Sequence, residues 1–421
     1  MSVERIVVTG MGAVTPYGIG VDKLWDSLVA GHCAVNQTRD EALREFAPVS
    51  AEVPDFDPRE KFSEKFVRDT TRFTQFALFA AMEATLDAGM SDGEPKTFRP
   101  GTSSERIGIF IGTGIGSLRD MDAGAAALAL DASAHVGPRL ISKSIPNAPA
   151  ATLAAQFGIH GPVLTYTTAC ASSANAIGEA MMWLKSGKID IAIAGGTDSL
   201  FAPSLLASLR EAGALAARGN GDFSTWSRPF DKERQGMAPG EGSALLVLES
   251  AERAKARNAK IHAELIGYGT SNDGYHQIAP EPGGRGGVLA IRQALLDAGL
   301  EPNDIDYINA HATATRAGDA SESRAFLEAF GEDLPQIPVS SIKGHIGHTL
   351  GAAASIEAVA CIRALQTGWL PPNMNCDDPD EGTPPNLIRH EAVERPIRTA
   401  LSTSFGFGGQ NGVLIFRKPQ V

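Results

Sequence analysis

The sequence predicts an α/β protein built from two similar halves, in which sheets are covered by helices. The main observation is an internal repeat: the segment ATLDAGM at 84–90 returns as ALLDAGL at 294–300, half the chain length later. In both halves this segment closes a helix and precedes a strand, at 106–111 and at 305–309. The two halves are expected to join near residues 250–265.

Two further segments of the second half repeat segments of the first. The strand, corner and helix of residues 162–187 are matched by those of 337–366, and GSALLVL at 242–248 is matched by GVLIF at 412–416. Equivalent corners in two such halves can face one another. Because ligand sites of open α/β sheets lie at the carboxyl ends of the strands, we expect the site where these corners meet.

The composition is that of an ordinary globular chain: 421 residues, 43% hydrophobic and 20% charged, enough for two domains or one large two-part core. The four cysteines form no CxxC pair and no zinc spacing, and the N-terminus lacks a signal-peptide apolar core, so we expect a reducing cytoplasm. No apolar run approaches the roughly 18 residues of a membrane helix. The net charge of −12 argues against a general nucleic-acid binder.

From the N-terminus, residues 5–12 (RIVVTGMG) are typical of a buried strand that runs into a glycine turn. Thr15 stands where a GxGxxG dinucleotide fingerprint needs its third glycine, so a structural turn is favoured over a cofactor loop. Residues 21–30 suit a short helix. The polar, proline-containing stretch 36–66 predicts a long surface excursion with little regular structure.

The middle of the first half contributes a buried helix and a core strand. Residues 73–88 are apolar nearly all round, which predicts a buried helix. Residues 107–111 (IGIFI) predict a core strand, and this strand ends in the glycine-rich segment GTGIG at 112–116.

The pattern changes period within residues 163–184, where a β-branched run gives way to apolar positions at helical spacing. Cys170 lies at this strand-to-helix corner, between small residues that allow a tight turn. The N–H groups and positive dipole end of the following helix would then point at the sulfur and favour a thiolate, the form that attacks acyl groups. A buried structural cysteine is the alternative.

Two histidines of the second half stand beside predicted element ends: His311 follows the strand at 305–309, and His348 precedes the next helix. Each alone is more typical of a hydrogen-bonded structural residue. With Cys170 at the matching corner, they form a constellation in which one imidazole can bond the sulfur and both can donate to an oxyanion. His345 is interpreted as a decoy, and an HxxH pair without a third ligand is weak evidence for zinc.

A glycine-rich loop, SFGFGGQNG at 404–412, lies near the C-terminus. Its backbone N–H groups are available as hydrogen-bond donors, and its glycines allow backbone movement. Two roles stay open for it: a turn between strands, or a mobile loop that supplies an oxyanion donor and lets a phenylalanine swing aside.

These motifs, in this order and spacing, resemble the β-ketoacyl-acyl carrier protein synthases of thiolase fold, most closely the type II condensing enzymes of fatty-acid elongation. The matching motifs are VTGMGAVTPYG, TACASSANAIG, SRPFDKERQGMAPGEGSALLVLE, NAHATAT, KGHIGHTLGAAASIEA and SFGFGGQNG. The resemblance covers essentially the whole chain. It implies a layered αβαβα architecture, with a half at 1–258 that carries the cysteine and a half at 259–421 that carries the histidines.

The resemblance also implies the activity and the roles of residues. An acyl chain held on Cys170 would undergo decarboxylative Claisen condensation with malonyl-acyl carrier protein, while His311 and His348 promote decarboxylation and stabilise the enolate. Lys343 would organise the site, and Phe405 would be the gate, with its N–H joining that of Cys170 in the oxyanion hole. The implied substrate-binding residues are Thr313 and Thr315, which would hold the pantetheine arm, Ile115, which would line the acyl pocket, and Glu357, which would organise the site together with Lys343.

A ping-pong scheme follows from these roles, because the acyl group waits on Cys170 as a thioester between transacylation and condensation. Decarboxylation of a malonyl thioester releases a carbanion equivalent without a strong base, provided that donors hold the thioester oxygen. Two neutral histidines supply those donors. Neither a redox cofactor nor a metal is expected.

The chain departs from the family pattern at several positions. The usual HGTSTP is HATATR here, with Ala312 and Arg316 as the changed residues, and a usual basic pair is Arg68 followed by Asp69.

The expected partners are an acyl carrier protein and a second copy of the chain in a homodimer, with no nucleic acid and no membrane. An acidic carrier protein needs local basic residues on a chain of this net charge. The expected contacts are Lys65, Arg68, Arg72 and Arg139, with Lys143 as a further candidate and plain solvation as the alternative for each.

The sequence also bears on three alternative functions. A thiolase typically uses a second cysteine near the C-terminal loop, and residues 404–412 contain none. An inert chain-length partner of a polyketide synthase would lack the nucleophile, whereas Cys170 is present. A catalytic ketosynthase of a type II polyketide or other secondary pathway is the main alternative, since the same triad serves both.

Overall fold

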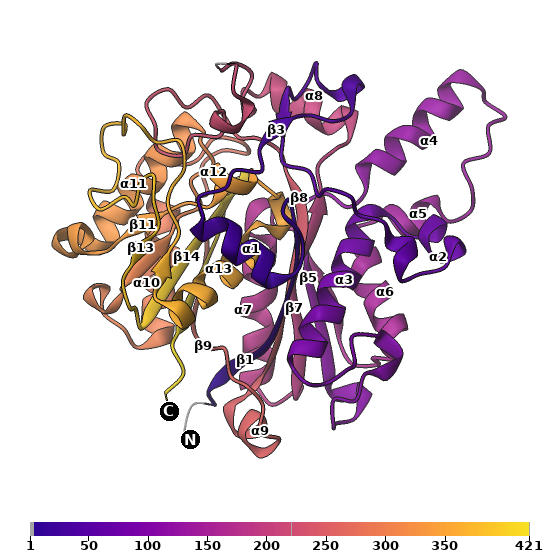
Figure 1. The fold of residues 1–421 in the computed structure, drawn as a ribbon, viewed down its shortest axis with the longest axis horizontal. Helices are drawn as coiled ribbons and strands as arrows, with labels where there is room; N and C mark the ends of the chain where they lie inside the picture. Colours follow the sequence, from indigo (N-terminus) through magenta and orange to yellow (C-terminus); the bar gives the residue numbers. More distant parts are fainter. Residues whose placement is uncertain (1–3, 220, 421) are drawn as a thin grey trace.

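A computed structural model describes residues 4–219 and 221–420 (Figure 1). The two predicted halves begin at Met1 and end at Val421, and both of these residues lie outside the described ranges. The strands of the central sheet are β1 (Ile6–Thr15), β2 (Gly18–Ile19), β5 (Ile107–Gly112), β6 (Val163–Tyr166), β7 (Ile191–Ser199), β8 (Glu241–Ser250), β9 (Ala263–Asn272), β10 (Tyr307–Asn309), β11 (Val339–Ser340), β14 (Thr399–Gly406) and β15 (Gln410–Arg417). In the described chain they form one mixed sheet in the order β11-β10-β14-β15-β9-β1-β8-β7-β5-β6, with β2 paired to β1.

The sheet has an internal two-fold pattern that matches the predicted repeat. From its centre, the first half runs β1-β8-β7-β5-β6 and the second runs β9-β15-β14-β10-β11. In both halves the first three strands pair antiparallel and the last two are added in parallel. The halves meet where β1 pairs antiparallel with β9. Because one sheet runs through both halves, the division of the chain into units 1–258 and 259–421 stays a prediction.

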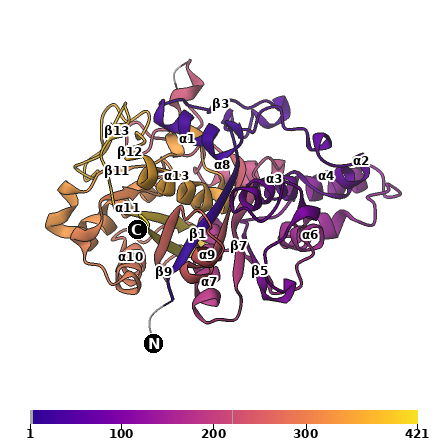
Figure 2. The same cartoon turned by 60° about the horizontal axis from the view of Figure 1, so that its bottom comes forward.

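Helices form the remaining layers (Figures 1 and 2). α3 (Arg72–Asp87) and α6 (Ala148–Phe157) cover the outer face of the first half, and α10 (Arg285–Ala298) and α11 (Arg316–Phe330) cover that of the second. α7 (Ser172–Lys185) and α13 (Ala353–Thr367) pack against each other and against strands of both halves. They make the central helical layer, so the expected α/β layering is present.

Glycines in β1 set how closely α3 packs on the sheet. A Cβ at Gly12 would lie 2.0 Å from the carbonyl oxygen of Ala80. The second half repeats this packing, since a Cβ at Gly269 of β9 would lie 2.0 Å from the carbonyl oxygen of Ala290 in α10. The glycine turn expected at residues 10–12 is therefore wrong. β1 stays extended through these glycines, because only a residue without a Cβ lets the helix backbone come this close.

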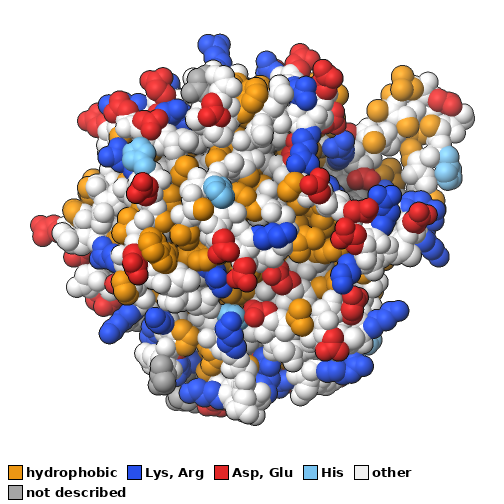
Figure 3. All heavy atoms as spheres, in the orientation of Figure 1, with side chains coloured by type: hydrophobic (Ala, Val, Ile, Leu, Met, Phe, Trp, Pro, Cys, Tyr) orange, Lys and Arg blue, Asp and Glu red, His pale blue; other side chains and the backbone are white. Residues whose placement is uncertain are grey.

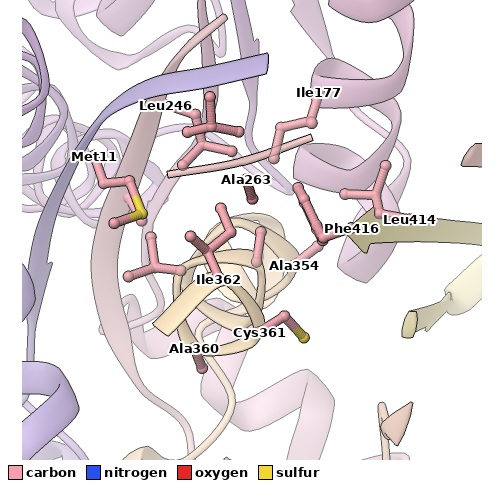
Figure 4. Packing of buried hydrophobic residues seen from close by; sticks show 14 of the residues in the cluster. Met11, Ile177, Leu246, Ala263, Ala354, Ala360, Cys361, Ile362, Leu414 and Phe416 are labelled. Atoms are coloured by element: carbon pink, nitrogen blue, oxygen red, sulfur yellow. The ribbon is translucent and has the colours of Figure 1, made fainter. Parts of the chain in front are cut away.

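The largest buried cluster joins the two halves at the centre (Figure 4). Ile177 of α7 and Ile362 of α13 belong to it together with Leu246 of β8 and Phe416 of β15, and all four are fully buried. Burial of one such side chain contributes about 1.5–3 kcal/mol. The two central helices are thus fixed relative to each other by side chains from both halves.

Most elements expected from the sequence are confirmed. The helix at 73–88 is α3, the short helix at 21–30 is α1 (Val21–Val29), and the strand at 107–111 is β5. The excursion at 36–66 contains only short pieces, among them β3 (Asn36–Gln37), β4 (Val49–Ser50) and the start of α2 (Glu64–Asp69). Across the described ranges, every helix is too short or too polar to cross a bilayer.

A helical arm that the sequence did not predict projects from the body. α4 (Leu118–Leu130) stands away from the sheet at the upper right of Figure 1, and Figure 3 shows apolar side chains on it. No residue of α4 is buried, and Leu130 is 90% exposed. An exposed apolar surface of this kind is typical of an interaction surface.

Candidate active site

Cys170 lies in a strained turn between β6 and α7. The 3₁₀ turn η5 (Ala169–Ala171) begins at Ala169, whose φ of 49° is in the left-handed region that alanine rarely adopts. The hydroxyl of Ser172 holds this turn, since it accepts from the Thr168 N–H at 2.9 Å and donates to the Ala169 carbonyl at 2.6 Å. The predicted strand-to-helix corner is confirmed.

The second half contains an equivalent turn before its own central helix. The turn η9 (Leu350–Ala352) precedes α13, and Leu350 has the same φ of 49°. Asp198 of β7 joins this turn to the loop that follows β5, because its carboxylate accepts from the N–H groups of Gly351 and Gly114, each at 2.7 Å. Burial raises the pKa of Asp198 to about 7. The turns η5 and η9 lie in contact, so the two corners face one another, as the repeat predicted.

Both predicted histidines lie beside Cys170. His348 Nε2 is 2.9 Å from Cys170 Sγ. The ring of His311 stands edge-on to that of His348, with 5.3 Å between the centroids and 85° between the planes. All three side chains are buried, and the sulfur and one nitrogen of each ring lie within 4.8 Å of one another. The structure thus brings together the residues that the sequence grouped.

The sulfur is a thiol in the resting site. Burial raises the pKa of the Cys170 thiol to about 12, and the charge of Lys343 and a hydrogen bond from the Phe407 N–H offset only part of this effect. The thiolate expected at the helix N-terminus is therefore wrong for the resting state, because loss of solvation outweighs the helix dipole. The thiol needs a base, and His348 Nε2 is within hydrogen-bonding reach.

The two histidines are neutral at pH 7. Burial lowers the pKa of both His311 and His348 well below 6.5, and the nearby charge of Lys343 lowers each pKa further. A neutral imidazole offers one donor and one acceptor nitrogen. His348 can therefore accept the thiol proton, and the pair can donate to an oxygen that gains charge.

A buried ion pair lies behind the histidines. Lys343 Nζ bonds the carboxylate of Glu357, and the two side chains are only 2% and 1% exposed. Burial raises the pKa of Glu357, and the charge of Lys343 opposes that rise. Glu357 is not among the described residues that line the cleft next to Cys170, and its expected part in substrate binding stays a prediction.

Glu322 fixes the backbone at His311, and the sequence analysis did not identify it. Its carboxylate accepts from the N–H groups of His311 and Ala312 at 2.8 and 2.7 Å and from the Thr403 hydroxyl at 2.6 Å. Burial raises the pKa of Glu322 to about 7. A signal was present in the sequence, since Glu322 lies one helical turn before Phe326 on the buried face of α11.

A cleft of about 740 Å³, including its open mouth, reaches the three residues. Thr313 and Thr315 line it, with their hydroxyls 3.1 Å apart. Ile115 packs in a small apolar cluster with Cys170 and Leu200. The cleft therefore offers hydroxyl groups along one wall and an apolar surface beside the sulfur.

Comparison with known families decides the identity. The model of the family "Beta-ketoacyl synthase, N-terminal domain" matches residues 3–254, and that of "Beta-ketoacyl synthase, C-terminal domain" matches residues 262–377. This chain belongs to the β-ketoacyl synthase family. The expected family and its thiolase-like α/β fold are thereby confirmed.

Full-length relatives agree with this assignment. The synthase is 38% identical to the 3-oxoacyl-[acyl-carrier-protein] synthase 2 of Coxiella burnetii over 419 residues and to that of Vibrio harveyi over 420 residues, covering 99% of each chain. A β-ketoacyl synthase structure from Burkholderia phymatum matches with a TM-score of 0.90 and 34% identity, over 99% of this chain and 100% of that one. The AntDE:AntF structure, a type II polyketide ketosynthase with its acyl-carrier protein, matches with a TM-score of 0.89 and 31% identity, over 99% and 100%.

The two phenylalanines of the glycine loop occupy different places in this β-ketoacyl synthase. Phe407 directs its N–H to the Cys170 sulfur. Phe405 still belongs to β14, and its ring lies 6.2 Å from that of His311 and packs close to Gly287 of α10. The amide next to the nucleophile is therefore that of Phe407, which corrects the expected oxyanion donor. The gating role of Phe405 stays a prediction.

His345 stands apart from the catalytic cleft of the synthase. Its ring nitrogens lie 2.9 Å from the carbonyl oxygen of His32 and 2.8 Å from that of Pro372. It therefore ties two distant loops together, which agrees with its interpretation as a structural residue.

Most residues expected to bind a carrier protein are engaged within the synthase. Arg72 donates to both carboxylate oxygens of Glu241, at 2.8 and 2.6 Å. Arg139 pairs with Asp69 at 2.8 Å. For the others, Arg68 lies 3.8 Å from Asp69, Lys143 pairs with Asp120 at 2.8 Å, and Lys65 is exposed without an ion pair to any described residue within 4.0 Å. The expected role of these residues in binding a carrier protein stays a prediction.

Proposed function

We propose that this β-ketoacyl synthase condenses an acyl chain held on Cys170 with malonyl-acyl carrier protein, giving 3-oxoacyl-acyl carrier protein in fatty-acid elongation. The observation that carries the proposal is the 2.9 Å contact between Cys170 Sγ and His348 Nε2 beside a second neutral histidine. The full-length similarity to enzymes named 3-oxoacyl-[acyl-carrier-protein] synthase 2 supports it.

The first half-reaction is acyl transfer. The Cys170 sulfur attacks the thioester carbonyl of the acyl-carrier protein while His348 Nε2 takes the thiol proton. The N–H groups of Cys170 and Phe407 are placed to receive the carbonyl oxygen as it gains charge. When the tetrahedral adduct collapses, its carbon–sulfur bond to the pantetheine breaks, and the released pantetheine thiolate takes the proton back from the histidine.

The second half-reaction is decarboxylative condensation. The bond between the malonyl methylene carbon and its carboxylate breaks, carbon dioxide leaves, and the electron pair remains as a thioester enolate. His311 and His348, both neutral, can donate hydrogen bonds to the enolate oxygen. The enolate carbon then attacks the acyl carbon on Cys170. The carbon–sulfur bond to the cysteine breaks, and the released thiolate takes one proton to restore the resting thiol.

The remaining expectations are proposals of the same kind. A carrier protein is the proposed partner, because the AntDE:AntF structure contains an acyl-carrier protein with its ketosynthase. A homodimer is proposed because the exposed apolar residues of α4 need a covering surface. We also propose a cytoplasmic location and structural units at 1–258 and 259–421.

A second candidate is condensation in a type II polyketide or other secondary pathway. Its support is the structural similarity to the ishigamide ketosynthase/chain length factor, with a TM-score of 0.91 and 33% identity over 100% of each chain. The same three residues would carry out the same condensation, so the two candidates differ in the number of extensions and in the partner chain.

Product analysis tests the proposal. The purified synthase is incubated with an acyl-carrier protein and malonyl-carrier protein, and the carrier-bound products are measured by mass spectrometry. A single 3-oxoacyl product supports fatty-acid elongation, whereas chains with several keto groups support the polyketide candidate. Release of carbon dioxide without any new carbon–carbon bond would contradict both. Because the atoms of Cys170, His311 and His348 are also close enough to hold a metal ion, the assay is repeated with a chelator, which should leave the rate unchanged.

A further inference from the structure

Arg234 is a buried arginine that lies behind one wall of the catalytic cleft, and the proposed reaction does not use it. It belongs to the loop that leads into β8, and its side chain is 3% exposed. Among the described residues it is not part of the lining of the cleft. A guanidinium that is buried needs partners for its charge and its donors, so the contacts of Arg234 decide what it can do.

The guanidinium binds the backbone of residues 313–316, here called the threonine segment, which carries Thr313 and Thr315. Its Nε and Nη2 donate to the carbonyl oxygens of Thr315 and Arg316, at 3.3 and 3.0 Å. Two residues further along the same loop, the Gly236 N–H donates to the Ala314 carbonyl at 2.9 Å. Successive carbonyl groups of the threonine segment are therefore bound from one loop.

Two carboxylates orient the guanidinium. Its Nε lies 3.4 Å from Asp319 of α11, and its Nη1 donates to Asp380 at 2.7 Å. Asp319 is 1% exposed and also accepts from the Phe230 N–H at 2.8 Å. Burial raises the pKa of Asp319 to about 6, so at pH 7 most of this carboxylate is ionised and can pair with the arginine. The arginine is thus tied to the helix that follows the threonine segment.

The threonine segment needs such support because its backbone is strained. Ala314 is fully buried and has a φ of 68°, in the left-handed region that residues with a Cβ rarely adopt. A conformation of this kind persists only where the surrounding structure enforces it. The bound carbonyl groups of the threonine segment are the points at which the loop of Arg234 enforces it.

The turn at Ala314 brings the hydroxyls of Thr313 and Thr315 together. Residues two positions apart in a regular strand are separated by about 6.6 Å. These hydroxyls lie only 3.1 Å apart, and both threonines line the cleft. Because a hydroxyl can donate to an amide oxygen or accept from an amide N–H, a pair at this spacing suits the amide groups of a pantetheine arm.

We infer that Arg234 is a positioning residue for the pantetheine arm of the substrate. It holds the strained turn at Ala314 and thereby keeps the two threonine hydroxyls together in the wall of the cleft. This inference rests on the proposed function, because only a substrate with a pantetheine arm would use that wall. The effect of Arg234 on the reaction should therefore depend on whether the acyl donor has such an arm.

The experiment compares two acyl donors that differ only in their thiol. Butyryl-pantetheine has the arm, and S-ethyl thiobutyrate has the same acyl group without it. Acylation of Cys170 is followed by mass spectrometry at several concentrations of each donor. The variant is Arg234→Lys, which keeps a positive charge beside the two carboxylates but lacks the planar fork that reaches both carbonyls. The matched control is Arg257→Lys, because Arg257 binds the buried Glu249 at the end of β8 away from the cleft.

Arg234→Lys should lower the efficiency of acylation by butyryl-pantetheine about tenfold, the effect of losing one well-placed hydrogen bond. The loss should arise mainly from a higher half-saturating concentration of the donor. With S-ethyl thiobutyrate the loss should stay below about twofold, since this donor has no arm to position. Equal losses with both donors, or a loss no larger than that of Arg257→Lys, would overturn the inference.

A second change tests whether Arg234 acts through the strained turn. Glycine adopts a positive φ readily, so in R234K/A314G the turn depends less on the arginine, and about threefold or more of the loss with butyryl-pantetheine should be regained. No regain would contradict the inference.

If Arg234→Lys does not fold, Asp380→Asn replaces it, because it weakens a partly exposed partner of the same guanidinium. It should cause a loss of about threefold that is confined to butyryl-pantetheine. No loss, or the same loss with both donors, would overturn the inference. If neither donor acylates Cys170 in the unchanged protein, the proposed function fails instead.

Discussion

Removing the charge of Lys343 should both destabilise the synthase and change its pH dependence. Lys343 is 2% exposed and pairs with Glu357, which is 1% exposed. In Lys343→Met the glutamate keeps its buried charge without a partner, which costs about 3–5 kcal/mol in the free energy of unfolding. In K343M/E357Q neither charge remains, so a large part of that loss should be recovered.

The pH dependence follows from the histidines. Burial lowers the pKa of both His311 and His348 well below 6.5, and the charge of Lys343 lowers each pKa further. In K343M/E357Q this repulsion is absent, and both pKa values rise towards 6.5. A protonated His348 cannot accept the thiol proton, so the acid limb of the profile of kcat/KM should move to higher pH.

Two measurements on the single and double variants test this reasoning. Urea unfolding gives the free energies, and acyl transfer to Cys170 measured from about pH 5 to pH 8 gives the position of the acid limb. A double variant that is no more stable than Lys343→Met would refute the buried-charge argument. An acid limb that does not move in the double variant would refute the claim that the charge of Lys343 adds to the effect of burial on the pKa of the two histidines.

Three further changes test other parts of the structure. His348→Ala should lower acyl transfer and condensation by roughly 100- to 1000-fold, whereas His345→Ala should lower the melting temperature and leave kcat nearly unchanged; equal kinetic losses would contradict their separate roles. Phe405→Ala should leave acyl transfer largely intact but shorten the lifetime of the acyl-enzyme, and a lower melting temperature with an unchanged lifetime would assign Phe405 to packing. Gly12→Ala should cost about 1–3 kcal/mol in urea unfolding, because its Cβ would meet the α3 backbone, while the open position Gly221→Ala should cost little.

The sequence predicted the two-half fold because the signals for it are local. The ATLDAGM and ALLDAGL segments end α3 and α10, and each helix precedes a buried strand of its own half. The corners at Cys170 and His348 are also marked locally, by a change from strand to helix period. Their meeting in space then follows from the symmetry of the sheet.

What the sequence could not predict depends on contacts between distant segments. Burial raises the pKa of Cys170, and the residue shares a buried cluster with Leu200 and Leu350, which come from separate parts of the chain. The pairing of Arg139 with Asp69 joins residues 70 positions apart. A motif that marks residue types does not show which of them neutralise or bury one another.

The choice between the two phenylalanines failed for a related reason. Phe405 and Phe407 lie two positions apart in one glycine-rich motif, so the pattern treats them alike. The structure separates them because β14 ends at Gly406, and the turn that follows brings the Phe407 amide to the sulfur. The point at which a strand ends is set by its pairing partner, here β15, rather than by the motif.

The most direct test of the account is to find where the acyl group is held. The synthase is incubated with acyl-carrier protein, digested and analysed by mass spectrometry, and the remainder is chased with malonyl-carrier protein. The account predicts an acyl thioester on the peptide that contains Cys170, none on Cys33, Cys361 or Cys376, and loss of that adduct in step with formation of the 3-oxoacyl product. An adduct on another cysteine, or product formed without any acyl group on Cys170, would contradict it.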